Sequence, residues 1–170
     1  MSRTFWRASL KKKLKPLTEN NPDFRLAILG IGNELWGDDA AGNQAARRIQ
    51  RSIHQPDHVL VIDAGPSPEA YSGVLRRFRP DFVLLIDTVR AGGTPGRISW
   101  VEFSDLEGVS ALTHGIPLTV LVQFLTRELG VKLGLLGIEG ESFELGGSLS
   151  LPVHRAVNRV VKELPKIIFG

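Results

Sequence analysis

Residues 26–42 decide the fold: they read LAILGIGNELWGDDAAG, an apolar run, a turn with three glycines and two adjacent aspartates. Glycine lets the backbone turn sharply without a steric penalty. A strand, a tight turn and a helix N-terminus in this order are typical of the ligand-binding edge of an open α/β sheet. A helix N-terminus ordinarily attracts an anion, but Asp38 and Asp39 already lie there. We therefore expect the bound species to be a cation.

The remainder of the chain alternates apolar runs with segments of helical periodicity. The apolar runs predict strands at residues 25–30, 59–63, 82–87, 97–103 and 132–139. Helical spacing and helix-starting prolines predict helices over residues 38–52, 68–77, 117–129 and from 152 onward. Such alternation implies mainly parallel strands covered by helices. The predicted fold is an α/β, three-layer α/β/α sandwich with a mainly parallel, about five-stranded twisted sheet and helices on both faces.

The composition narrows the classes of protein and of chemistry. A chain of 170 residues is long enough for one domain with a substantial core. It contains no cysteine, which excludes disulfides, thiolate zinc sites and a cysteine nucleophile. No apolar run approaches the roughly 18 residues of a transmembrane helix, and no apolar segment of a secretory signal follows the basic N-terminus. We therefore expect no transmembrane segment and a cytoplasmic location.

The net charge of +3 is unevenly distributed. Residues 1–24 hold six basic and two acidic side chains, whereas residues 25–170 hold 15 basic and 16 acidic ones. We therefore divide the chain into a basic N-terminal extension, residues 1–24, and a single α/β domain, residues 25–170. Because the domain itself is close to neutral, we expect no nucleic-acid partner.

Within the extension, apolar residues recur at helical spacing. Trp6, Leu10 and Leu14 predict a short amphipathic helix over residues 4–15, which Pro16 is expected to end. One interpretation is an extension that packs on the domain or is partly disordered. The other is an arm that docks on an acidic partner or on a membrane surface. The sequence leaves the role of this extension open.

Acidic side chains follow each of the first three predicted strands. Asp38 and Asp39 come after the first strand, Asp63 ends the second and Asp87 ends the third. Because the carboxyl ends of parallel strands share one edge, we expect all four acids there. Taken singly, Asp38 is expected to cap the helix, and Asp63 to accept hydrogen bonds from the loop at 65–67. Asp87 follows a buried strand, where a carboxylate is unfavourable unless it is paired, hydrogen-bonded or bound to a cation.

One histidine is placed for a role at this edge. His114 lies in a loop just ahead of the helix predicted from residue 117. With Asp39 and Asp87 it would form a mixed oxygen and nitrogen ligand set, which suits nickel, zinc or iron(II). Three protein ligands with open positions are typical of a reacting metal site. The other histidines, expected to be structural or solvated, are His54, His58 and His154.

Two further readings stay open. A dinucleotide-binding module of the Rossmann type would use Asp63, which ends the second strand where a ribose-binding acid would lie. Against it, the glycines at 30, 32 and 37 do not follow G-x-G-x-x-G, and two aspartates would repel a pyrophosphate. The other is a non-catalytic domain that binds a metal or a protein.

An ordered set of short motifs spans residues 26–165. The motifs are Gly30-Ile31-Gly32-Asn33, Gly37-Asp38-Asp39-Ala40-Ala41-Gly42, Val61-Ile62-Asp63-Ala64-Gly65, Arg79-Pro80, Leu85-Ile86-Asp87-Thr88, Pro95-Gly96, Thr113-His114-Gly115-Ile116-Pro117-Leu118 and Gly137-Ile138-Glu139. Each motif is weak alone, but the ordered set resembles the maturation endopeptidases of nickel–iron hydrogenases.

The resemblance implies an endopeptidase, of the aspartyl type, that removes the C-terminal extension of a nickel–iron hydrogenase large-subunit precursor after nickel insertion. It implies recognition of nickel that the precursor carries and that the free enzyme binds only weakly. Other hydrogenase maturation proteins are further candidate partners. The implied catalytic and metal-binding residues are Asp39, Asp87 and His114, with Asp38, Asp63, Gly32 and Asn33 in support.

The chain departs from the family pattern at two places. Residues 1–24 have no counterpart in it. Glu139-Gly140 stands where the family often has Gln-Pro, in a loop that we expect to bear on substrate specificity.

Overall fold

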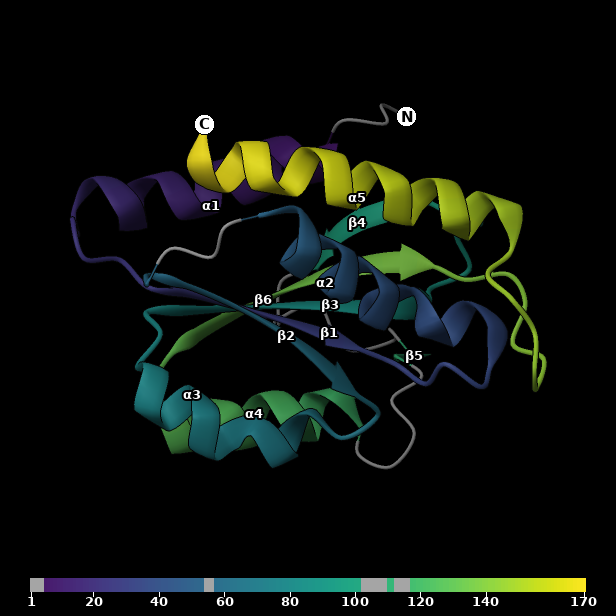
Figure 1. Cartoon of the computed structure of the whole chain (residues 1–170), viewed down its shortest axis with the longest axis horizontal. Helices are drawn as coiled ribbons and strands as arrows, with labels where there is room; N and C mark the ends of the chain where they lie inside the picture. The colour runs from purple at the N-terminus through teal and green to yellow at the C-terminus, as the bar shows by residue number, and fades with distance from the viewer. Residues whose placement is uncertain (1–4, 54–56, 102–109, 112–116) are drawn as a thin grey trace.

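A computed structural model of the chain describes residues 5–53, 57–101, 110–111 and 117–170. Its sheet has the strand order β2-β1-β3-β6-β4, with β5 paired to β3 (Figure 1). The strands β2, β1, β3 and β6 are parallel, whereas β4 and β5 pair antiparallel with β6 and β3. Their bounds are β1 Leu26–Ile31, β2 Val59–Gly65, β3 Phe82–Arg90, β4 Ile98–Val101, β5 Ser110–Ala111 and β6 Lys132–Glu139. The predicted mainly parallel sheet is confirmed, while β5 lies where no strand was predicted.

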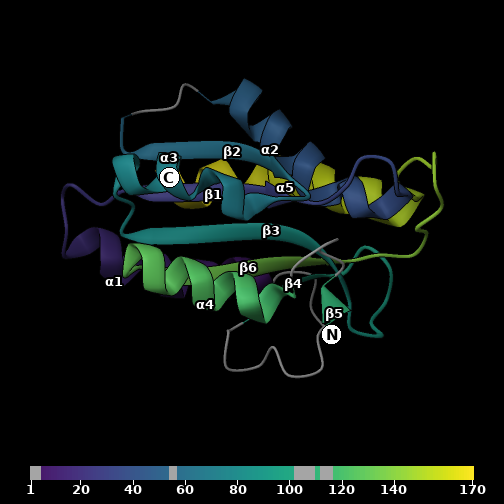
Figure 2. The same cartoon turned by 90° about the horizontal axis from the view of Figure 1, so that it is seen from below.

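Helices cover both faces of the sheet, as predicted. On one face lie α1 (Phe5–Glu19), α2 (Ala41–Ser52) and α5 (Leu151–Phe169); on the other lie α3 (Ser72–Phe78) and α4 (Leu118–Leu129). Figure 2 shows α3 and α4 in front of the sheet and α5 behind it. Short 3₁₀ helices precede two of them, η1 (Gly37–Ala40) before α2 and η2 (Pro68–Tyr71) before α3. Among the described residues, no helix has the length and apolarity that crossing a bilayer requires.

Strand β3 lies at the centre of two hydrophobic cores. All of its residues except Arg90 are buried, because the strand is almost continuously apolar and helices cover both of its faces. Phe82 and Leu84 face the core under α1, α2 and α5, whereas Val83 and Leu85 face the core under α3 and α4. The only acid of the strand, Asp87, therefore lies buried near the carboxyl edge of the sheet.

Helix α1 belongs to the core of the molecule. Trp6, Leu10 and Leu14 are buried in the same cluster as Val157 of α5. Outside the core, the guanidinium of Arg7 donates a 3.0 Å hydrogen bond to Glu163 of α5. For the described part of the extension, the interpretation of a segment packed on the domain is confirmed.

The prediction that Pro16 ends this helix is wrong, because α1 continues to Glu19. Proline lacks an N–H, so the carbonyl of Lys12 loses its helical partner. Lys12 and Pro16 are both exposed, which lets water replace that hydrogen bond. Leu17 packs against the core beyond Leu14 and holds the last turn in place.

Helix α2 begins in direct contact with the backbone of two strands. A Cβ atom added to Gly42 would lie 2.2 Å from the carbonyl oxygens of both Ile31 in β1 and Ile86 in β3. Only a residue without a side chain permits this approach. The start of α2, and η1 directly before it, are thereby fixed against the ends of β1 and β3.

Candidate functional site

The carboxyl ends of the central strands place four acids at one edge of the sheet. In the strand register, Gly30 of β1 pairs with Asp63 of β2. On the other side of β1, Asp87 follows the β3 partner of Gly30. The helix η1 comes directly after the turn that follows β1 and carries Asp38 and Asp39. This is the arrangement that the alternation of strands and helices predicts.

Asp38 is fully buried and binds a distant loop. Its Oδ2 accepts hydrogen bonds from the backbone N–H of Glu141 and of Ser142, each at 2.8 Å. The N–H of Ser150 donates to Oδ1 at 2.6 Å and the Ser150 hydroxyl to Oδ2 at 2.8 Å. The prediction that Asp38 caps the helix is wrong, since neither η1 nor α2 has a side-chain cap. Instead, the carboxylate accepts four hydrogen bonds from residues of the 141–150 segment.

Asp39 and Asp87 are the two acids of this edge whose charges interact. Both are buried, with relative exposures of 1% and 0%. The N–H of Asn33 donates to Oδ2 of Asp39 at 3.0 Å, and the N–H of Thr88 donates to Oδ1 of Asp87 at 2.7 Å. The other oxygen of Asp87, Oδ2, accepts no hydrogen bond from any described residue.

Burial raises the pKa of Asp87 well above its ordinary value. The hydrogen bond from Thr88 acts in the opposite direction, and the negative charge of Asp39 raises the pKa further. Asp87 therefore holds its proton to a higher pH than an exposed aspartate does. Two buried carboxyl groups at one edge are costly unless hydrogen bonds or a cation compensate them.

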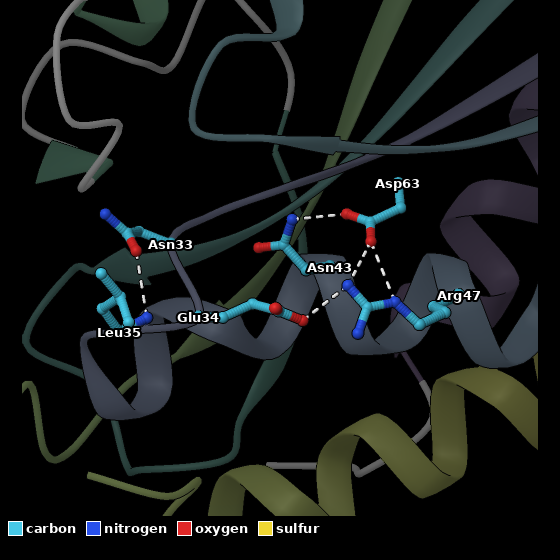
Figure 3. Close-up of polar contacts among 6 residues, drawn as sticks. All are labelled: Asn33, Glu34, Leu35, Asn43, Arg47 and Asp63. Atoms are coloured by element: carbon cyan, nitrogen blue, oxygen red, sulfur yellow. Dashed lines mark hydrogen bonds and ion pairs between the residues drawn. The ribbon is translucent and has the colours of Figure 1, made fainter. Parts of the chain in front are cut away.

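Asp63 is held by helix α2, not by the loop at 65–67, so that prediction is wrong (Figure 3). Its Oδ1 accepts a 2.6 Å hydrogen bond from Nδ2 of Asn43, and its Oδ2 accepts two from the guanidinium of Arg47, at 3.0 and 2.5 Å. Arg47 also contacts Glu34 at 2.6 Å. With both oxygens of Asp63 occupied, its suggested role in binding a ribose loses support.

Asn43 and Arg47 were not identified from the sequence. They lie four residues apart on α2, so both side chains reach the same face of the helix. The hydrogen bond to Asp63 is the main cause that raises the pKa of Arg47. A polar pair at this spacing beside an apolar helix face is the signal that could have identified them.

Gly32 and Asn33, to which the resemblance assigns a supporting role, lie in the turn beside Asp39. Gly32 has φ of +145°, and a Cβ there would lie 1.8 Å from the carbonyl oxygen of Asp39. The side-chain oxygen of Asn33 accepts the N–H of Leu35 at 3.0 Å (Figure 3). Together with the bond from its own N–H to Asp39, this fixes Asn33 between the turn and the acid.

His114, the proposed third ligand, lies outside the described residues, as does His54. The other two histidines, His58 and His154, are exposed, as expected of solvated side chains. Within the described residues, no cluster of three histidine, aspartate or glutamate side chains is arranged to hold a metal ion. The described donors for a cation at the edge of the sheet are thus Asp39 and Asp87.

The segment after β6 forms an open cavity of about 500 Å³ close to Asp38. It is lined by Arg90, Gly140, Glu141, Ser142, Phe143 and Glu144. The guanidinium of Arg90 lies 3.8 Å from the ring centroid of Phe143, a cation–π contact. Glu139, noted as a departure from the family pattern, is buried and accepts the N–H of Ala91. Glu139 thus fixes the end of β3.

Large apolar side chains are exposed next to these acids. Leu35 and Leu145 are 62% and 68% exposed, and Trp36 is 37% exposed. A β-bridge joins Trp36 to Leu145, and the N–H of Gly146 donates to the carbonyl of Leu35 at 2.7 Å. We call Leu35, Trp36 and Leu145 the apolar rim of the site.

Comparisons with known proteins identify the family. The family model of the hydrogenase maturation protease HycI matches residues 44–167, a range that includes Asp63, Asp87 and His114. The hydrogenase 3 maturation protease of Escherichia coli strain K12 is 30% identical over 138 residues, which are 81% of this chain and 86% of that protein.

Solved structures of the same family share the fold. The crystal structure of the NiFe hydrogenase maturation protease HycI from Thermococcus kodakarensis KOD1 has a TM-score of 0.77 and 29% identity, and covers 86% of this chain and 93% of that one. The solution structure of the endopeptidase HycI from Escherichia coli has a TM-score of 0.70 and 26% identity, over 84% and 90% of the two chains. The chain therefore belongs to the hydrogenase maturation protease family and is a peptidase of hydrogenase maturation.

Proposed function

We propose that this peptidase removes the C-terminal extension of a nickel–iron hydrogenase large-subunit precursor and recognises the nickel that the precursor carries. The observation that carries the proposal is the buried pair Asp39 and Asp87 at the edge of the sheet. Both carboxyl groups are buried, and the charge of Asp39 raises the pKa of Asp87, so a second negative charge is disfavoured there and a divalent cation would compensate both.

The donor chemistry fits a divalent transition ion. Carboxylate oxygens and an imidazole nitrogen form a mixed set that such ions accept. Oδ2 of Asp87 can bind a cation without giving up a hydrogen bond to a described residue. Asp39 keeps its bond from Asn33 on Oδ2, which orients its carboxylate.

His114 is proposed as the third donor on the basis of chain connectivity. Ala111 of β5 pairs with Val89 of β3, and Val89 is two residues beyond Asp87. His114 follows Ala111 by three residues, which span at most about 10 Å of extended chain. The connection therefore allows the imidazole to reach the carboxyl group of Asp87.

The residues of the chain have separate tasks in this proposal. A divalent ion, when bound, supplies polarisation of the scissile amide or of a water molecule. Asp39, Asp87 and His114 hold the nickel-bearing part of the precursor so that the scissile bond lies at the edge of the sheet. Asp38 is a positioning residue, which joins η1 to the 141–150 segment. The apolar rim offers a surface for the precursor chain on either side of the bond.

The precursor is the proposed substrate and main partner, with other hydrogenase maturation proteins as further candidate partners. We expect the reaction to occur in the cytoplasm. Nickel enters with the substrate, and two carboxylates with one histidine predict weak binding of nickel to the free enzyme.

The test is cleavage of nickel-loaded and nickel-free precursor by the wild-type enzyme and by Asp39→Ala, Asp87→Ala and His114→Ala. We expect the wild type to cleave only the loaded form, and each variant to lose at least about a hundredfold in rate. Matched controls are Asp57→Ala and His154→Ala, which change exposed residues and should retain full activity.

Two results would contradict the proposal. Equal cleavage of loaded and nickel-free precursor by the wild type would exclude recognition of nickel. Full activity of Asp39→Ala or Asp87→Ala, with folding checked by circular dichroism, would exclude the assigned site.

A further inference from the structure

Basic side chains are concentrated in one layer of the molecule. The helices α1, α2 and α5 contain 12 basic and two acidic residues, a net charge of +10. Because the whole chain has a net charge of +3, the remaining residues together carry −7. The helices of the opposite layer, α3 and α4, contain three basic residues and one acidic residue. The charge count by sequence placed the excess of basic residues in the N-terminal extension. In the structure, basic residues of α2 and α5 lie in the same layer as those of α1, so the basic charge covers one face.

The three helices present this charge on a common outer surface. The three helices lie side by side on the same face of the sheet (Figure 1), with their apolar sides buried in one core. Except for Asn43 and Arg47, which reach Asp63, most of their polar residues therefore lie on the outer side. On α5 the exposed Arg155, Lys162 and Lys166 follow one another at helical spacing. On α1, Lys11 and Lys12 are exposed. We call the outer side of α1, α2 and α5 the basic face.

Apart from Arg47, which pairs with Asp63 and Glu34, few residues of the basic face are compensated by acids. One of the two acids within these helices, Glu163, binds both Arg7 and Lys166. Desolvation acts to raise the pKa of Glu163, but the hydrogen bonds from Arg7 and Lys166 outweigh it and lower the pKa. Lys11, Lys12 and Lys162 form no ion pair with a described residue. A surface with this excess of unscreened cations attracts an anionic partner at physiological salt.

We propose that the basic face docks this protein on an anionic lipid bilayer. Positive side chains near such a surface each strengthen binding by about fivefold, so several acting together give stable association. Phe5 at the start of α1 and Phe169 at the end of α5 are 72% and 45% exposed. Aromatic rings at the margin of a basic surface are suited to the headgroup region. This docking is independent of the proposed cleavage reaction.

The shape of the layer favours a membrane over a nucleic acid. Each helix lies lengthwise on the sheet with its apolar side buried, so none of the three projects to enter a major groove. The basic residues of the three helices are six lysines and six arginines, and neither their number nor their spacing favours the bidentate reading of bases. A broad, basic helical layer complements a planar sheet of anionic headgroups.

Docking by this face would leave the candidate site accessible. The four acids of the candidate site lie at the carboxyl ends of the strands. This edge is at one end of the sheet and is not part of the outer surface of the helices. An anionic bilayer repels acids and attracts the basic face, so both effects turn the site edge away from the lipid. A precursor can then approach the site from the side.

The experiment is co-sedimentation of the full chain with vesicles. One set contains phosphatidylcholine alone, and the other also contains about 30 mol% phosphatidylglycerol, which makes the surface anionic. We expect binding only to the anionic vesicles, and weaker binding at higher salt. The triple variant Lys11→Glu/Lys12→Glu/Lys162→Glu should bind about a hundredfold more weakly.

The matched control is Arg77→Glu/Arg127→Glu/Lys132→Glu, which changes the net charge equally but alters exposed residues outside the basic face. It should retain more than half of the vesicle binding, with folding of both variants checked by thermal melting. Equal loss in both triple variants would overturn the proposal, because net charge alone would then explain binding. Absence of binding to anionic vesicles, or tighter binding to duplex DNA or to polyglutamate than to vesicles, would overturn it as well.

Discussion

The carboxylate of Asp38 and the residue Ser150, which are 112 positions apart in sequence, are joined by two hydrogen bonds of 2.6 and 2.8 Å. One comes from the backbone N–H of Ser150 and the other from its hydroxyl. The start of α5 is thereby fixed to η1. Ser142 accepts the N–H of Asp38 on its carbonyl oxygen and donates its own N–H to the Asp38 carboxylate. A buried acid thus connects three segments of the chain around the site.

Asp38→Asn should destabilise the fold by about 2–3 kcal/mol, because the amide group turns a donor toward backbone N–H groups that need an acceptor. The free energy of unfolding in urea measures this effect. Ser150→Ala is the control, since it removes only the hydroxyl donor and should lose about 1 kcal/mol. A loss in Asp38→Asn no larger than that in Ser150→Ala would mean that the other three hydrogen bonds contribute little.

Asp87→Asn should be more stable than the wild type near pH 8 while it loses activity. The folded-state pKa of Asp87 lies above its ordinary value of 3.8, so the folded state retains a proton that the unfolded state has released. Stability of the wild type therefore falls as pH rises from about 4 through the folded-state pKa, whereas the asparagine is unaffected. Urea denaturation at several pH values checks this.

In that experiment the two proteins should converge in stability as the pH approaches 4. Asp57→Asn, at an exposed position, is the control and should show no such pH-dependent gain. A constant difference between Asp87→Asn and the wild type across the whole range would show that the effect is not electrostatic.

If nickel binds at Asp87, its affinity should increase with pH, because the raised pKa requires the carboxyl group to release a proton first. Calorimetry in buffers of different ionisation enthalpy counts the protons released. The wild type should release up to one proton more per nickel than Asp87→Asn. Protons released by histidine are the same in both proteins, so the difference reports on Asp87. Equal proton release in the two proteins would be inconsistent with a neutral Asp87 in the free enzyme.

Gly42→Ala should destabilise the protein by about 3 kcal/mol or more, because the added Cβ has no space between two strand backbones. The control is Gly73→Ala in α3, where the nearest atom would be the end of the Arg77 side chain at 3.9 Å. That substitution should stabilise by about 0.5–1 kcal/mol through helix propensity. Thermal unfolding of both variants measures the difference, and a mild effect of Gly42→Ala would mean that α2 can shift outward.

Leu145→Ser should raise the KM for the precursor about tenfold and change kcat less than twofold, if the apolar rim contacts the substrate. Val120→Ser is the matched control, because Val120 of α4 is likewise exposed, at 48% against 68%, but lies on another part of the molecule. Steady-state cleavage of nickel-loaded precursor separates the two constants. An unchanged KM in Leu145→Ser would exclude this residue from substrate binding.

The fold could be predicted from the sequence because its signals are local and repeated. The run at 82–87 is apolar enough to identify a central strand, and the acids after strands share an edge in any parallel sheet. The helix in the N-terminal extension was found from Trp6, Leu10 and Leu14 alone. Its end was misjudged because the packing of Leu17, a tertiary contact, outweighs the local effect of Pro16.

The partners of the acids could not be predicted, since hydrogen bonds between distant segments leave no periodic pattern. Asp38 has the sequence context of a helix cap, yet its donors lie more than a hundred residues away. Asp63 binds Asn43 and Arg47 across the layer between β2 and α2. Asp87 differs, because a lone acid after a buried strand already indicates an unusual electrostatic environment.

The contact of Gly42 with the backbones of β1 and β3 also has a consequence for selectivity. The spacing between Asp39, three residues before Gly42, and Asp87, one residue after Ile86, is set by the backbone of the sheet and not by a mobile loop. If this pair holds a cation, its backbone anchors limit how far the two carboxylates can separate or approach around ions of different size. Calcium, which requires many oxygen ligands at 2.3–2.6 Å, as is typical, should therefore compete poorly for it. If the pair binds a cation as proposed, the spacing of two strand backbones would then influence which ion it accepts.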